Sequence, residues 1–271
     1  MTELLVSGVS AAEHAAPGGH SARVVGELAR LQGKRMVRHP VVLVGLAWVV
    51  VAMGFGSPGT PYEEYSGVTG LVAFFIGPLA FFAANLVASS ERRSGADDWT
   101  GALSMPERDR TLALLVAALA PAGLAAVLNL VLYAVIAVDG VAMPIAWTHV
   151  ASVPLTVLGG AVLGVAVARL LPWPGMALLV MVGLVSFNMW VATVEDYLGF
   201  YVDFARWEGG EEIPLMEPGN GSLHLVYLGA LVALAACGAL LRDVRRPIIP
   251  LVLGGGFGTL VLVAGTLQLS T

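Results

Sequence analysis

Residues 150–171 read VASVPLTVLGGAVLGVAVARLL, which is long and apolar enough to cross a lipid bilayer as one helix. A helix rises about 1.5 Å per residue, so about 20 residues span a hydrocarbon core of about 30 Å. The stretch contains no Lys, Asp or Glu, and its one charged side chain, Arg169, lies near an end where it can extend to the membrane interface. This stretch therefore predicts a transmembrane helix.

Six further stretches of the same kind occur along the chain, and none of them contains Lys, Arg, Asp or Glu. The last one holds four glycines between residues 254 and 258, which lower its helix propensity. Together the seven stretches predict an all-α fold, a polytopic integral membrane protein with about seven transmembrane helices. The six are Pro40–Gly56, Val68–Ala88, Thr111–Val138, Pro174–Val194, Leu223–Leu241 and Ile248–Leu269.

The composition agrees with a membrane protein and excludes several other classes. Charged residues make up 12% of the chain, against roughly 25% in an ordinary soluble domain, and 57% of the residues are hydrophobic. The net charge of -5 argues against a nucleic-acid partner, which would require an excess of Lys and Arg. Cys237 is the only cysteine, so the sequence predicts neither an internal disulfide nor a cysteine-based metal site.

Basic residues gather on one side of the seven-span arrangement. Of the 14 Lys and Arg residues, only Arg206 falls on the other side. By the positive-inside rule, the basic side is the cytoplasm, with the N-terminus inside and the C-terminus outside. Residues 1–20 are interpreted as a mobile cytoplasmic tail. Residues 21–39 place Val24, Leu28 and Leu31 at helical spacing and predict an amphipathic interfacial helix that ends before Pro40.

The polar residues form no recognisable catalytic set. Lys34 is the single lysine, and no glycine-rich phosphate loop precedes it, so the sequence predicts no ATP site in this chain. No metal site is predicted either. Asn85, Asn129 and Asn188 stand out within the spans, where they either line a substrate pathway or hydrogen-bond between helices, which is the commoner role.

The loop between the second and third spans, residues 89–110, has the most specific pattern. Ser94 can cap a short helix with Asp97 and Asp98 in its first turn, and Trp99 and Leu103 would then share one face. Apolar anchors surrounded by charges are typical of protein-docking surfaces. The alternative interpretation is a solvated connector with its tryptophan in the lipid headgroups.

Three features in and around this loop form a pattern. A basic segment, residues 28–40, leads into the first span, residues 91–95 read Glu-Arg-Arg-Ser-Gly, and Pro106 is followed by a basic cluster and by TLALL at residues 111–115. In this pattern the chain resembles the membrane subunit of a type-2 ABC transporter, an exporter-type permease family common in bacteria.

The resemblance implies a six-span permease domain over residues 40–246. The apolar run within residues 247–271 predicts an additional C-terminal span, which departs from the six spans usual in the family. The resemblance further implies a homodimer, or a heterodimer with a homologous permease, in the bacterial plasma membrane. Separate cytoplasmic ABC ATPase subunits would bring ATP and Mg, and this chain itself would hold no cofactor. The ATPase-coupling residues would be Glu91, Arg92, Arg93, Gly95, Asp97, Asp98, Trp99 and Leu103.

The resemblance also implies a short outer hairpin between the fifth and sixth spans. Residues 195–222 occupy that place and are rich in aromatic residues, which suit a membrane interface. The residues of this outer gate would be Tyr197, Phe200, Tyr201 and Phe204.

The function favoured by the resemblance is the transmembrane subunit of an ATP-driven exporter. Two alternatives stay open: an integral membrane enzyme that acts on lipids, and a non-transporting immunity or assembly factor. The lack of a set of catalytic polar residues at one membrane depth argues against the enzyme.

Overall fold

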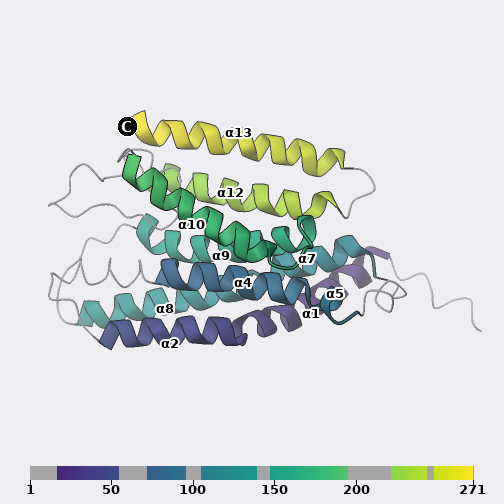
Figure 1. Ribbon diagram of the computed structural model, residues 1–271, viewed down its shortest axis with the longest axis horizontal. Helices are drawn as coiled ribbons and strands as arrows, with labels where there is room; N and C mark the ends of the chain where they lie inside the picture. The colour runs from purple at the N-terminus through teal and green to yellow at the C-terminus, as the bar shows by residue number, and fades with distance from the viewer. Residues whose placement is uncertain are drawn as a thin grey trace, which may run out of the picture.

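The computed structural model describes residues 17–54, 72–95, 105–138, 147–194, 221–242 and 247–270. All regular structure in these ranges is helical, which confirms the predicted all-α class for the described part of the chain (Figure 1). The elements are α1 (Pro17–Val37), α2 (Pro40–Gly54), η1 (Val72–Ile76), α4 (Gly77–Ala88), α5 (Ser90–Arg93), α7 (Glu107–Ala117), α8 (Leu119–Val138), α9 (Trp147–Leu170), α10 (Met176–Val194), α12 (Gly221–Leu241) and α13 (Ile248–Ser270).

Within the described residues, four helical stretches are long and apolar enough to cross a membrane, as expected of a multi-pass membrane protein. They are Glu107–Val135, Val150–Leu170, Gly221–Leu241 and Ile248–Leu267. The other three predicted spans contain apolar helices that are shorter within the described residues: Pro40–Val51, Gly77–Ala88 and Met176–Phe187. A helix of 12 residues, such as α4, covers about 18 Å, which is less than the hydrocarbon core.

Prolines account for several places where a predicted span is not one regular α-helix. Pro78 has no N–H to donate to residue 74, and the turn before it is the π-helical η1. Pro121 likewise has no N–H for the Ala117 carbonyl, and the long third stretch breaks at Ala118 into α7 and α8. Pro154 lies inside α9 without ending it.

The centre of the bundle is the contact between α4 and α9 (Figure 1). A Cβ at Gly160 would lie 2.5 Å from the Gly77 carbonyl oxygen, and one at Gly164 would overlap the Phe81 carbonyl. Close backbone approach over small residues is a common way to pack helices in a membrane. Gly77 of α4 lies against Gly160 of α9, and Phe81 lies against Gly164. The contacts thus advance in the same order along both helices, so α4 and α9 run in the same direction.

Two further helices extend the packing from α9. Val232 of α12 lies against Gly159, and α13 then packs on α12, with Ala264 of α13 buried against Tyr227 and Leu228. The predicted seventh span is therefore a continuous helix despite its glycines. Most of its apolar side chains are exposed, as they are on α2 and α10, which suits helices surrounded by lipid.

The N-terminal helix α1 packs against α7. Its buried residues include Ala29, Gly33 and Met36, and a Cβ at Gly33 would lie 2.9 Å from the Ala120 Cβ. The apolar residues Val24 and Leu31 are exposed and lie outside this packed face, and the interfacial placement of the helix stays a prediction.

The helix break predicted before Pro40 is present. The helix α1 ends at Val37 and α2 begins at Pro40. The Nδ1 atom of His39 accepts a hydrogen bond from the Val41 N–H at 3.4 Å, which helps to satisfy the first turn of α2.

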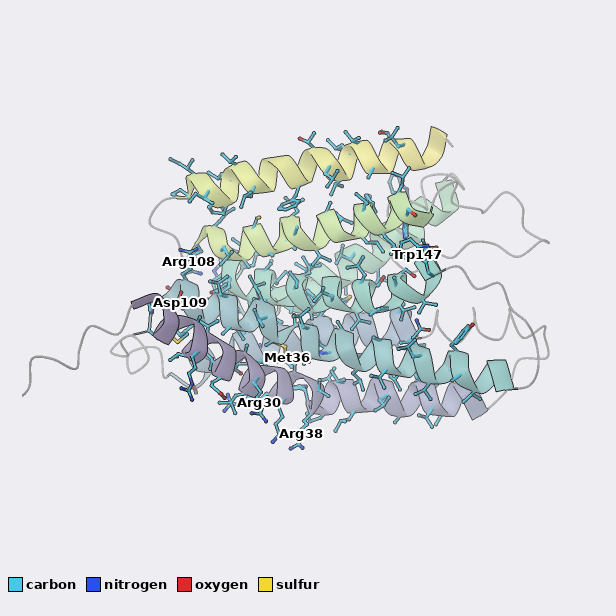
Figure 2. The ribbon with its side chains drawn as sticks, turned by 180° about the vertical axis from the view of Figure 1, so that it is seen from behind. Arg30, Met36, Arg38, Arg108, Asp109 and Trp147 are labelled. Carbon is cyan, nitrogen blue, oxygen red and sulfur yellow. The ribbon has the colours of Figure 1, made fainter. Side chains whose placement is uncertain are left out.

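The basic residues lie at one end of the bundle, which we call the charged end. Figure 2 shows Arg108 near this end and Trp147 toward the opposite end, with Arg30 and then Arg38 progressively farther from the charged end. The starts of α1 and α7 and the ends of α9 and α12 meet at the charged end (Figure 1). Of the Lys and Arg residues, Arg206, Arg245 and Arg246 lie outside the described residues.

Candidate functional site

The site with the most polar contacts is the C-terminal end of α9, where arginines from two other segments converge. An Arg92 Nη1 donates to the Ala168 carbonyl at 3.4 Å, and an Arg242 Nη1 donates to the Arg169 carbonyl at 2.9 Å. We call Arg92, Arg169, Arg242 and Glu107 the arginine cluster. It joins α5, α7, α9 and the end of α12.

The end of α9 at Leu170 and the prolines that follow explain why its last carbonyls need such donors. Pro172 leaves the Ala168 carbonyl unpaired within the helix, and the helix end leaves that of Arg169 unpaired. The final carbonyls of a helix have no partner within that helix. Pro172 and Pro174 have no N–H, so they cannot donate to the carbonyls of Ala168 and Leu170 in a continued turn. A cation is also favourable at the negative end of the helix dipole. The arginines therefore cap α9 from neighbouring elements.

Arg169 also forms an ion pair within the cluster. Its Nη1 lies 3.5 Å from the Oε1 of Glu107, the first residue of α7. The Arg169 side chain is 8% exposed, whereas that of Glu107 is 47% exposed. The half-exposed carboxylate limits the stabilisation by this pair to about 1 kcal/mol. Its structural effect is to attach the start of α7 to the end of α9.

The predicted coupling residues fall into two groups. Glu91, Arg92 and Arg93 form most of the short helix α5, and Gly95 follows it with a φ of 66° that favours glycine. Its N–H donates to the Arg92 carbonyl at 3.2 Å, which ends the helix. The remaining coupling residues, Asp97, Asp98, Trp99 and Leu103, lie outside the described residues.

Asn129 of α8 compensates for the proline inside α9. Pro154 has no N–H for the Val150 carbonyl, four residues earlier. The Nδ2 of Asn129 donates to that same carbonyl at 2.9 Å, and Asn129 is fully buried. Neighbouring helices commonly satisfy the backbone groups freed by proline in a membrane. Asn129 and Pro154 therefore act as a pair.

We expect Asn129→Leu to destabilise the protein by about 1–3 kcal/mol, because it leaves a buried carbonyl without a donor. In a Pro154→Ala background the carbonyl regains its intrahelical partner, so the same substitution should cost distinctly less. Unfolding of the four proteins in detergent micelles measures this double-mutant cycle. Equal costs of Asn129→Leu in both backgrounds would contradict the pairing.

Asn85 also bonds to the backbone of α9. Its Nδ2 donates to the Gly164 carbonyl at 3.2 Å, and its side chain is buried in the contact between α4 and α9. Asn85 and Asn129 thus both form hydrogen bonds between helices. This is one of the two roles that the sequence allows for them, the other being to line a substrate pathway. The side chain of Asn188, on α10, lies outside the described residues. A pathway role for the three stays a prediction.

Comparisons with protein-family models, with curated proteins and with solved structures match nothing to this chain. Its functional interpretation therefore rests on its own residues and their arrangement.

The opposite end of the bundle contributes little to the described site. The predicted gate residues Tyr197, Phe200, Tyr201 and Phe204 lie outside the described residues. Among the residues that the structure describes, no group of three or more His, Cys, Asp or Glu side chains could hold a metal ion.

The arginine cluster is the feature that sequence reasoning missed. Arg169 looked like a side chain that extends to the interface, and Arg242 like a topological signal. The sequence does contain a usable signal, because two prolines directly after a long helix predict unsatisfied carbonyls there. Which arginines would supply the donors depends on how distant segments pack.

Proposed function

We propose that the chain is the permease subunit of an ATP-driven exporter, and that residues 89–110 couple it to a separate ABC ATPase subunit. The observation that carries the proposal is the attachment of this loop to the bundle. Arg92 on its N-terminal side bonds to the end of α9, and Glu107 on its C-terminal side pairs with Arg169. A partner that moves the loop therefore acts on α4, α7 and α9 together.

The connected helix ends support a mechanical role for the charged end. Arg242 extends the same network to α12, and the close contact between α4 and α9 transmits displacement along their length. ATP and Mg bound by the partner would drive closure of the ATPase subunits. The resulting movement of the loop would tilt the helices and open a route for substrate between two copies of the permease, or between it and a homologous permease.

The proposed arrangement has seven spans in the plasma membrane, with the charged end in the cytoplasm. The shared direction of α4 and α9, with the long α7–α8 stretch between them in sequence, supports alternating crossings. The gathering of basic residues at one end supports its cytoplasmic placement by the positive-inside rule.

We expect cysteine labelling to place residues 94 and 271 on opposite sides of the membrane. In a Cys237→Ser background, Thr271→Cys should react with an impermeant reagent added to intact cells, whereas Ser94→Cys should react only after the membrane is opened. A Thr271→Cys protein shielded in intact cells would contradict the crossing by α13.

Purification from native membranes in a mild detergent tests the proposed function. We expect a stoichiometric ABC ATPase subunit to copurify, and a substitution that inactivates its ATP hydrolysis to abolish the transport phenotype. Function that persists with an inactive ATPase would favour the immunity or assembly factor. Lipid turnover by the chain without any ATPase would favour the membrane enzyme.

A further inference from the structure

A second basic site lies beside the junction of α1 and α2, farther along the bundle than the arginine cluster (Figure 1). Where α1 meets α2, an open, groove-like cavity of about 550 Å³ is lined by Lys34, Arg35 and Arg38 on one side and by Leu86 and Ser90 on the other. Lys34 and Arg35 belong to the last turn of α1 and Arg38 directly follows that helix, while Leu86 and Ser90 come from α4 and α5. The cavity thus lies between two elements that are distant in sequence.

The charge of this cavity is strongly one-sided. Lys34, Arg35 and Arg38 are exposed, and His39 also lines the cavity. Among the described residues, no carboxylate forms an ion pair with these three cations. Part of their placement is explained by the helix dipole, since Lys34 and Arg35 occupy the last turn of α1. The dipole does not account for a cavity that gathers three cations with no carboxylate among its described lining residues.

The rest of the lining is apolar and continues onto lipid-facing surface. Leu31, Pro40, Leu86 and Val87 complete the wall, and Leu31 is 59% exposed. The apolar helix α2 begins immediately after His39, so the cations lie at the boundary where polar residues give way to a membrane-spanning stretch. Figure 2 shows Arg38 pointing away from the bundle at this boundary. The lining of this one cavity therefore changes from cationic side chains to apolar side chains.

We propose that this cavity binds the phosphate headgroup of an anionic phospholipid, with the start of an acyl chain along Leu31 and Leu86. Clusters of Lys and Arg beside a transmembrane helix attract anionic lipids, and basic pockets between helices hold their headgroups. Arginine donates paired N–H groups to phosphate oxygens, and lysine supplies a point charge. The proposal requires only that the chain resides in a membrane, so it does not depend on transport.

Native mass spectrometry of the full chain in a neutral detergent tests the proposal, with phosphatidylglycerol and phosphatidylcholine as probes. We expect phosphatidylglycerol to bind at least tenfold more tightly. Replacing Lys34, Arg35 and Arg38 together by Gln should weaken its binding at least tenfold. Replacing Arg23, Arg30 and Arg108 by Gln removes the same charge from exposed residues outside the cavity, and it should change binding less than threefold.

A second variant leaves every charge in place and keeps the proposal testable if the triple variant misfolds. Leu86→Trp fills the cavity, and we expect it to weaken phosphatidylglycerol binding while the helix content stays unchanged. Equal effects of the two triple variants, or unchanged binding by Leu86→Trp, would overturn the site. Displacement of the lipid by equimolar glycerol phosphate or inorganic phosphate would overturn the lipid assignment in favour of a soluble phosphate ligand.

Discussion

Gly164→Val should destabilise the protein by about 3 kcal/mol, the upper end of the cost of overpacking a core. A Cβ at this position would overlap the Phe81 carbonyl, which belongs to the backbone of α4 and cannot rotate away. The helices would have to separate, and the bond from Asn85 to the Gly164 carbonyl would be lost with the contact. Unfolding in detergent micelles measures the change.

Gly256→Val is the matched control for this prediction. It makes the same substitution in α13, where a Cβ at Gly256 would meet no atom within 4 Å. We expect the control to change stability by less than about 1 kcal/mol, since valine is no worse in a helix than glycine. If both variants unfold alike, the close contact of α4 and α9 does not hold the bundle together.

Trp99→Ala should weaken binding of the ATPase subunit about thirtyfold, which corresponds to about 2 kcal/mol. The prediction rests on the sequence, where Trp99 is the one large aromatic residue in a loop rich in charges of both signs. Aromatic anchors carry a large share of the binding free energy at protein interfaces. Export should fall with the affinity, while the stability of the isolated subunit should not change.

Trp147→Ala provides the comparison, because Trp147 is 66% exposed at the opposite end of the bundle. Its loss should leave ATPase binding at the original affinity. Quantitative pull-down of the ATPase subunit with each variant measures the difference. Wild-type binding by Trp99→Ala would remove the docking role from this loop.

Long apolar runs made the fold predictable. The span predicted over residues 150–171 lies within α9 except for its last residue, and the break before Pro40 occurs where the residue before proline disfavours a helix. The first residue of a helix was less predictable. Pro174 and Gly175, with a φ of 87° at the glycine, delay the start of α10 to Met176.

The polar contacts could not be predicted to the same degree, because each one depends on two segments that are distant in sequence. The sequence singles out Asn129 and contains Pro154, but only the packing of α8 on α9 brings the amide to the freed Val150 carbonyl. The face of α1 that packs against the bundle could not be predicted for a different reason. In a membrane protein small residues permit close packing, so Gly33 faces the bundle while Leu31 is exposed.

Photocrosslinking from position 99 tests the central claim most directly. A photoreactive phenylalanine analogue replaces Trp99 in cells, keeping an aromatic side chain, and the same analogue at Trp147 serves as the control. The account predicts a crosslink from position 99, and none from position 147, to an ABC ATPase subunit identified by mass spectrometry. Crosslinks from position 99 only to lipid or to this chain would contradict it.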